Sequence, residues 1–275
     1  MGNHSNLIYA LKDGVITSIS DVPSGLKCGC VCPACGAALV ARKGTKIMHH
    51  FAHYAGENCE YGYETSLHMA AKEVLSRSKR IVIPAVYVDF PQSGKARTLV
   101  SQEKEIEIDH VELEKSFGDV IPDVVVYSGG KKFFVEIFVT HAIDEEKLAR
   151  LKAQNISTIE IDLSKEERGI SEEDLSKVLL ESNAKKEWKY NAVANRYYHC
   201  FLDASDKMRI TVRGMALHVD GCPLQMRIWK GKAYANFIDE CTGCEYCVFY
   251  SDGSYVLCSG RRRISKISDF LKKQD

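Results

Sequence analysis

The eleven cysteines of this 275-residue chain constrain its fold more than any other feature. Five lie between Cys28 and Cys59, five lie between Cys222 and Cys258, and Cys200 stands apart. An odd number of cysteines without a secretory signal favours metal or redox chemistry over a set of disulfides. We therefore expect two small metal-binding modules on either side of a separate domain that lacks cysteine.

The N-terminal cluster lies in VCPACGAALVARKGTKIMHHFAHYAGENC, within residues 1–60, which are too few for a self-sufficient core. Two thiolates on a tight knuckle and two ligands from a following hairpin would complete a tetrahedral zinc site. We expect a zinc-finger module whose ligands are Cys32, Cys35, His50 and His53, with Cys59 as the substitute for one histidine.

The C-terminal cluster falls within residues 185–275, which we expect to form a helix, a cysteine-rich module and a basic tail. Strand-like segments between its cysteines favour a zinc ribbon. Its ligands would be Cys222, Cys241, Cys244 and Cys258, with Cys247 as the alternative ligand. An iron–sulfur cluster on the Cys241-x2-Cys244-x2-Cys247 triple and one outlying cysteine is the competing interpretation.

Residues 61–184 show the periodicities of a mixed domain. Apolar residues recur every three or four positions from Tyr63 to Arg80, which predicts a helix. Three or four strands, a helix over DEEKLARLKAQ, the strand STIEIDLS and a helix over SEEDLSKVLLES follow, and a further helix is expected over KKEWKYNAVANRYYHCF. The fold class is therefore α/β (α+β).

Two carboxylates stand out in the hairpin IPDVVVYSGGKKFFVEIFV. Asp123 begins one strand, and Glu136 lies within the apolar run of the next. A carboxylate in such a run is costly to bury unless it is paired or binds a cation. Together the two can hold one hard divalent ion, Mg²⁺ or Mn²⁺, which activates water and neutralises phosphate charge. The alternative is that Glu136 pairs with a lysine on a half-exposed sheet.

This hairpin resembles the Pro-Asp…Glu-x-Lys signature of the PD-(D/E)XK nuclease superfamily. With CPACG…LVARKG…HHFAH and ETSLHMAAKE before it, the chain resembles the CoiA-like competence-protein family from about Cys28 to Asp162. The resemblance implies a restriction-endonuclease-like αβββαβ core behind a zinc finger, cutting DNA with a divalent metal. It assigns Asp123 and Glu136 to the metal, and Glu64 to the acidic position on the first helix.

One position departs from that signature, because Phe138 stands where the superfamily has its lysine. Lys72, which shares a helix face with Glu64 and His68, is one candidate replacement, and Lys147 on the second helix is another. His141 at the end of the catalytic strand, or His68, would serve as the general base, since histidine titrates near neutrality.

The balance of 37 basic and 37 acidic side chains conceals an uneven distribution. Residues 101–183 carry 10 basic and 20 acidic side chains, whereas residues 184–275 carry 16 and 10. Basic flanks around an acidic core would supply phosphate contacts to DNA. The candidate contacts are Arg227, Lys230, Arg261, Arg262 and Arg263, followed by Lys272 and Lys273 in the tail.

The leading interpretation is a metal-dependent DNA nuclease acting in DNA uptake, defence against foreign DNA such as phage, or repair. The alternatives are a non-catalytic nucleic-acid-binding scaffold and a nuclease subunit that a partner protein activates. Many superfamily members dimerise to cut both strands, so a homodimer is also consistent with the resemblance. With no secretory signal and no apolar run of roughly 18–20 residues, we expect a cytoplasmic protein without membrane spans.

Overall fold

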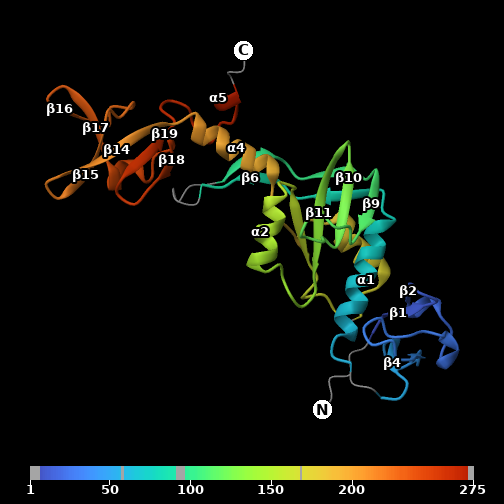
Figure 1. Ribbon diagram of the computed structural model, residues 1–275. Helices are drawn as coiled ribbons and strands as arrows, with labels where there is room; N and C mark the ends of the chain where they lie inside the picture. The colour runs from blue at the N-terminus through green and yellow to red at the C-terminus, as the bar shows by residue number, and fades with distance from the viewer. Residues whose placement is uncertain (1–6, 57–58, 91–96, 168, 272–275) are drawn as a thin grey trace. The chain divides into compact units, whose positions relative to one another are not determined.

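The computed structural model describes residues 7–56, 59–90, 97–167 and 169–271 (Figure 1). Contacts divide the chain into two compact units. The first comprises Met1–Pro84 and Lys104–Tyr190, and the second comprises Ala85–Glu103 and Asn191–Asp275. Lys272 and Lys273 of the expected basic tail lie outside the described residues.

The first unit is built on a five-stranded sheet in the order β13-β12-β11-β10-β9. Strands β11 and β12 are parallel and the other pairs are antiparallel. Helices α1 and α2 and the strands of this sheet follow one another as α1-β9-β10-β11-α2-β12, with β5–β8 inserted between α1 and β9. The expected αβββαβ order is therefore found within a mixed α+β fold, with this insertion. The bounds are α1 Gly62–Ser76, β9 His110–Leu113, β10 Val124–Ser128, β11 Lys131–Phe138, α2 Glu145–Ala153, β12 Thr158–Asp162 and β13 Lys186–Tyr190.

Alternation along the strands gives this sheet two apolar faces. Val124 and Val135 belong to the same buried cluster as Leu67 of α1. Phe134, one position earlier on β11, belongs to a separate cluster with Leu151 of α2. The near-continuous apolar sequence of β10 and β11 therefore reflects burial on both faces.

The β10–β11 hairpin sets the relation between the two carboxylates. Gly129 and Gly130 form its turn with positive φ angles of 54° and 73°, as a type I′ turn requires. The register pairs Val124 with Val135. Continuing the register by one position brings Asp123 opposite Glu136.

The N-terminal segment forms two small hairpins, β1 with β2 and β3 with β4. Its Leu7 and Phe51 are fully buried in the same core as Leu67 of α1, and the Tyr9 hydroxyl donates to the Ile170 carbonyl at 3.0 Å. The expected boundary at residue 60 is therefore not a boundary between compact units. The remaining elements of this unit are β1 Tyr9–Lys12, β2 Val15–Ser18, β3 Leu39–Arg42, β4 His50–His53, β5 Arg80–Ile83, β8 Lys104–Glu107 and α3 Glu172–Ser176.

The second unit contains a six-stranded sheet in the order β16-β17-β15-β14-β19-β18. Residues 85–103 also belong to this unit, although they were expected in the central domain. Phe90 of this segment packs against Phe201 of α4. The bounds are β6 Val86–Val88, β7 Thr98–Ser101, α4 Ala192–Asp203, β14 Asp206–Arg213, β15 Ala216–Asp220, β16 Arg227–Trp229, β17 Lys232–Asn236, β18 Cys247–Tyr250, β19 Tyr255–Cys258 and α5 Ser268–Leu271.

The helix expected over residues 185–201 was wrong in its first half. Lys186–Tyr190 forms the edge strand β13, held by bonds from the Lys186 amine to the Val82 carbonyl and from the Trp188 indole to the Pro84 carbonyl. The helix starts only at Ala192, after the Asn191 side chain caps it. Within the described ranges, no helix has both the length and the apolar character that crossing a membrane requires.

Candidate active site and metal centre

A cavity of about 460 Å³ opens where α1, the end of β11 and the start of α2 meet. It gathers most of the residues that the sequence singled out for nuclease chemistry. The polar side chains that line it are Tyr61, Glu64, Thr65, His68, Asp123, Glu136, His141, Asp144, Lys147 and Glu160.

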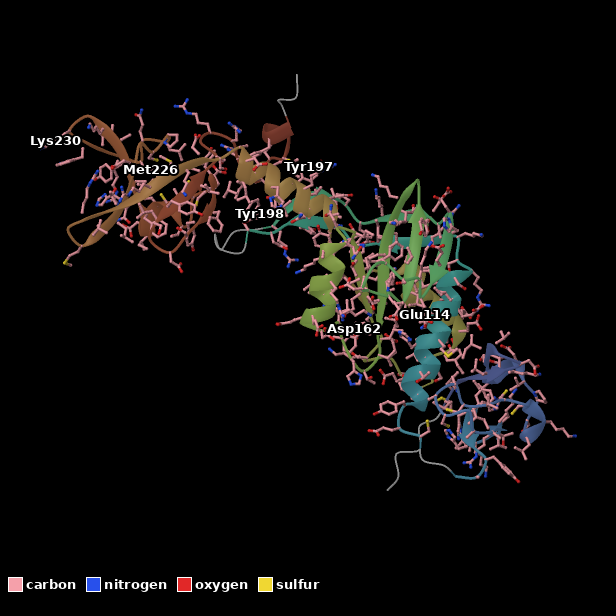
Figure 2. All side chains as sticks on the ribbon, in the orientation of Figure 1. Glu114, Asp162, Tyr197, Tyr198, Met226 and Lys230 are labelled. Atoms are coloured by element: carbon pink, nitrogen blue, oxygen red, sulfur yellow. The ribbon has the colours of Figure 1, made fainter. Side chains whose placement is uncertain are left out.

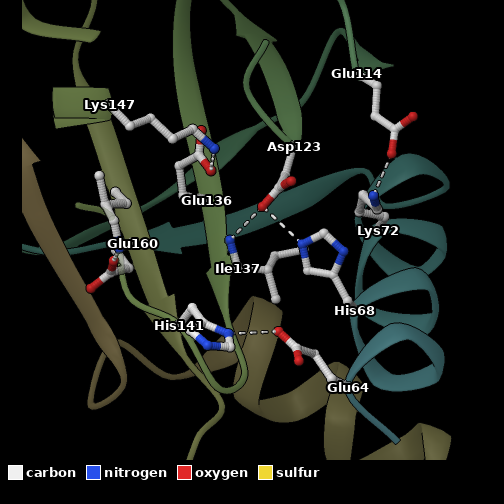
Figure 3. Close-up of polar contacts among 11 residues, drawn as sticks. Glu64, His68, Lys72, Glu114, Asp123, Glu136, Ile137, His141, Lys147 and Glu160 are labelled. Atoms are coloured by element: carbon white, nitrogen blue, oxygen red, sulfur yellow. Dashed lines mark hydrogen bonds and ion pairs between the residues drawn. The ribbon is translucent and has the colours of Figure 1, made fainter. Parts of the chain in front are cut away.

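Asp123 is held by two donors at one of its oxygens (Figure 3). Its Oδ2 accepts from His68 Nε2 and from the Ile137 backbone N–H, each at 2.9 Å. Burial works to raise the pKa of Asp123, but the hydrogen bond and charge of His68 outweigh it, so the pKa is lowered. The carboxylate therefore stays ionised.

Glu136 is the most unusual group in the cavity, because it is only 3% exposed. Its Oε2 accepts from Lys147 Nζ at 2.6 Å, whereas its Oε1 is buried without a hydrogen-bond partner. Burial, together with the nearby Asp123 charge, raises the pKa of Glu136 to about 7 despite the lysine. A buried oxygen of this kind requires a proton or a cation.

Glu64 and His141 meet at the cavity mouth. His141 Nδ1 lies 3.3 Å from Glu64 Oε1 and 2.8 Å from the Thr140 hydroxyl. The side chain of His141 is exposed, so Nε2 remains accessible when Nδ1 carries the proton donated to Glu64. The sequence-predicted His141 and Glu64 are thus brought together.

The two lysines that could replace the motif lysine have different partners in the structure. Lys147, on the first turn of α2, reaches Glu136 inside the cavity. Lys72 instead pairs with Glu114 at 2.6 Å, and neither residue is among those that line the cavity (Figure 3). The structure therefore does not bring Lys72 to the cavity, and Phe138 is likewise absent from the lining.

Glu160 is a cavity residue that the sequence reasoning missed. It sits beside Glu136 in the parallel register, is 5% exposed, and pairs with Lys189 at 2.9 Å. Its Oε2 also accepts from the Ile143 backbone N–H at 2.8 Å. This bond fixes the loop that carries His141. In the sequence, the signal that could have identified Glu160 as a site residue was a charged side chain within the apolar strand TIEID.

The donor set of this cavity fits a hard divalent cation. Asp123 and Glu136 present carboxylate oxygens from the β10–β11 hairpin, whereas Glu64 lines the same cavity and pairs with His141. In the described part of the chain these three carboxylates do not bring their oxygens within 4.8 Å of one another. Oxygen ligands are those that Mg²⁺ and Mn²⁺ prefer, with waters completing the coordination. The unpartnered Oε1 of Glu136 is the observation that such an ion would explain.

A second centre lies in the N-terminal segment. Cys32, Cys35, His53 and Cys59 place their ligand atoms within 4.8 Å of one another. Cys32 Sγ and Cys59 Sγ are 3.8 Å apart, and Cys35 Sγ lies 3.4 Å from His53 Nε2. These separations match the edges of a zinc tetrahedron, about 3.8 Å between sulfurs and about 3.5 Å from sulfur to nitrogen. The cluster can therefore hold a structural metal such as zinc.

His50 is not part of this cluster, so the preferred ligand set was wrong in one member. His50 and His53 lie three residues apart on β4, so they point to opposite faces of the hairpin. His50 is buried and its Nδ1 contacts the Met48 carbonyl oxygen at 2.9 Å. Cys59, the substitute ligand, takes its place.

Gly62 ties this centre to the first helix. A Cβ at Gly62 would lie 3.3 Å from the Cys59 sulfur and 3.5 Å from that of Cys32. Gly62 is also the first residue of α1, which carries Glu64 and His68. The metal cluster therefore packs directly on the start of the helix that lines the cavity.

The C-terminal cysteines form a looser group. Cys222, Cys241, Cys244, Cys247 and Cys258 line one small cavity of the second unit. Across the described part of the chain, only the N-terminal group brings all its ligand atoms within 4.8 Å.

Most of the candidate DNA-contacting side chains already have protein partners. Arg227 pairs with Glu240 at 2.8 Å, Arg263 pairs with Glu245 at 3.6 Å, and Arg262 donates to the Ala204 carbonyl. Lys230 lies 4.7 Å from the centroid of the exposed Trp229 ring, at the hairpin tip labelled in Figure 2. Arg261 is exposed.

Comparison with known proteins gives one match. The protein-family model described as "Competence protein CoiA, N-terminal domain" matches residues 26–62. That segment contains Cys32, Cys35, His53 and Cys59 and ends at Gly62. No curated protein and no solved structure matches the chain.

Proposed function

We propose that this protein is a divalent-metal-dependent DNA nuclease. The observation that carries the proposal is the buried Glu136, whose Oε1 has no partner and whose Oε2 meets Lys147, directly beside the ionised Asp123. The αβββαβ order supports a PD-(D/E)XK assignment. The match of residues 26–62 to the CoiA N-terminal domain supports a role in competence, that is, in the processing of incoming DNA.

In this proposal Asp123, Glu136 and Glu64 hold Mg²⁺ or Mn²⁺. When bound, the ion supplies a water of lowered pKa and neutralises charge on the phosphodiester. His68 positions Asp123 through the 2.9 Å bond to Oδ2. Glu64 orients His141, whose Nε2 accepts a proton from the attacking water.

Lys147 takes the part of the missing motif lysine. Its amine already lies inside the cavity, 2.6 Å from Glu136, whereas Phe138 occupies the motif position on the strand. From this position the Lys147 ammonium would contact a phosphate oxygen and stabilise the charge that develops in the transition state.

Two observations favour a second candidate, a nucleic-acid-binding protein without catalysis. Phe138 replaces the motif lysine, and the Lys147 ammonium occupies an oxygen that a metal ion would use. A single assay distinguishes the two candidate functions, because only the nuclease cleaves DNA when magnesium is supplied.

The test is cleavage of linear, circular and single-stranded DNA by the full chain with Mg²⁺, Mn²⁺ or EDTA. We expect cleavage with either metal and none with EDTA. Glu136→Ala and Asp123→Ala should lower the rate by roughly 1,000-fold or more, since several kcal/mol of charge stabilisation are lost. Glu112→Ala is the matched control, because Glu112 is a carboxylate of the same sheet that pairs with Lys115 outside the cavity.

Full activity of either cavity variant would rule out the assignment. DNA binding without cleavage would favour the non-catalytic candidate. Cleavage that appears only after adding a partner protein would identify a nuclease subunit of a larger complex.

A further inference from the structure

The C-terminal cysteines converge on one place although they come from separate segments. Cys222 follows β15, Cys241 ends the helical turn after β17, Cys244 lies before β18, and Cys258 ends β19. With Cys247 they surround a cavity of about 30 Å³ whose remaining lining is largely apolar. Thiolates are the ligands that zinc and other thiophilic metals select.

Four of the five thiols form the better ligand set. Cys222, Cys241, Cys244 and Cys258 all line this cavity. Cys247 differs, because it is buried on β18 and its thiol donates to the Phe249 carbonyl at 3.6 Å. Cys247 therefore has a backbone partner of its own.

The backbone at Cys258 is prepared for a thiolate. The Gly260 N–H donates to the Cys258 sulfur, from a glycine with a φ of +69° that other residues rarely adopt. The N-terminal centre uses the same device, since the N–H groups of Ala34 and Cys35 donate to the sulfur of Cys32. Donors aimed at sulfur favour its charged form, which is the form that binds metal.

Without a cation this arrangement is unfavourable for thiolates. The five thiols surround a small cavity with a largely apolar lining, where thiolates would carry uncompensated charge. A metal ion would replace the thiol protons and compensate the buried charge. The cavity has room for one ion.

We propose that the second unit holds one zinc ion on Cys222, Cys241, Cys244 and Cys258, as a structural centre separate from the Cys32 centre. The ion draws the four sulfurs closer together than they lie here. It joins the loop after β15, the loop before β18 and the end of β19, and so stabilises the small second unit. Cys247 is not a ligand.

The first test is the zinc content of the full chain, measured by inductively coupled plasma mass spectrometry against protein concentration. We expect about two zinc ions per chain, one at each centre. Cys241→Ser and Cys258→Ser should retain about one. Cys247→Ser and Cys200→Ser are matched cysteine controls and should retain about two.

A second measurement needs no variant and therefore does not depend on variant folding. X-ray absorption at the zinc edge of the wild-type chain reports the mean ligand set. Two centres, one with three sulfurs and a nitrogen and one with four sulfurs, predict about 3.5 sulfur and 0.5 nitrogen ligands per zinc. One zinc per chain with about three sulfurs and one nitrogen would overturn the proposal. Iron with acid-labile sulfide, absorbing near about 400 nm, would overturn it as well.

Discussion

The Cys32 centre and the Glu136 cavity differ in how far their ligands are assembled. At the first, four ligand atoms already lie within 4.8 Å of one another. At the second, the carboxylates are engaged by protein side chains, Asp123 by the His68 imidazole and Glu136 by the Lys147 ammonium. A closed thiol site suits a structural ion, whereas an open cavity with exchangeable partners suits catalysis.

The largest effect is expected at the thiol site, where the roles of two nearby histidines can be separated. His53→Ala should lose the N-terminal metal, whose binding is worth on the order of 10 kcal/mol of folding free energy. His50→Ala should keep it, because the His50 imidazole bonds the Met48 carbonyl and lies outside the ligand cluster. Zinc content and thermal unfolding of the two variants measure the difference. Equal zinc loss in both would contradict the assigned ligand set.

A second effect concerns the pH dependence of stability without metal. The pKa of Glu136 is raised from 4.5 to about 7, so the folded state binds this proton more tightly than the unfolded state. Its contribution to the free energy of unfolding is therefore largest below pH 4.5 and is lost as pH rises towards 7, by on the order of 3 kcal/mol.

Denaturant unfolding at several pH values, with no magnesium added and the zinc retained, would measure this loss. Glu136→Gln should flatten the dependence between pH 4.5 and 7. Magnesium should stabilise the wild-type chain at pH 8 and have less effect on the variant. An identical pH profile for the two chains would count against the buried, unpaired state of Glu136.

The third comparison is between the two lysines. Lys147→Ala should slow DNA cleavage by roughly 100-fold, in the range typical of a lost catalytic proton or charge donor. Lys72→Ala should leave the cleavage rate within a few-fold, since its ammonium pairs with Glu114 outside the cavity. Single-turnover rates at saturating magnesium test both. The opposite ranking would show that Lys72 replaces the motif lysine.

The smallest effect is expected from His68, which acts through Asp123. Removing an outer partner of a metal-binding carboxylate typically weakens metal affinity by about 10-fold or more. His68→Ala should therefore raise the magnesium concentration needed for half-maximal cleavage, with the maximal rate largely retained. His68→Gln, which keeps a donor near Asp123, should restore part of the affinity. A lowered maximal rate at unchanged magnesium demand would instead mark His68 as the general base.

Local patterns in the sequence predicted the parts of this site that lie close together in the chain. The Gly129–Gly130 turn and the strand pattern around it were enough to pair Asp123 with Glu136. Cys32 and Cys35 were readable from their spacing. The mixed α+β class followed from the periodicities, whereas the αβββαβ order came from the family resemblance.

Contacts between residues far apart in the sequence determined the features that sequence patterns left undecided or predicted wrongly. Cys59 replaces His50 because strand alternation turns the two β4 histidines apart, which spacing alone did not reveal. Lys186–Tyr190 pairs with β12 although its sequence continues a helical pattern. The placement of α2 against the sheet showed that Lys147 reaches Glu136, and the pairing of Lys72 with Glu114 showed that Lys72 does not.

The most direct test of the central claim is calorimetric titration of the full chain with Mn²⁺ at pH 8. The wild-type protein should bind one Mn²⁺ per chain, and Glu136→Gln should bind it at least about 100-fold more weakly, with unchanged zinc content. Glu112→Gln should bind as the wild type does. Equal Mn²⁺ affinity in the Glu136→Gln and wild-type chains would contradict the proposal that this cavity holds the catalytic metal.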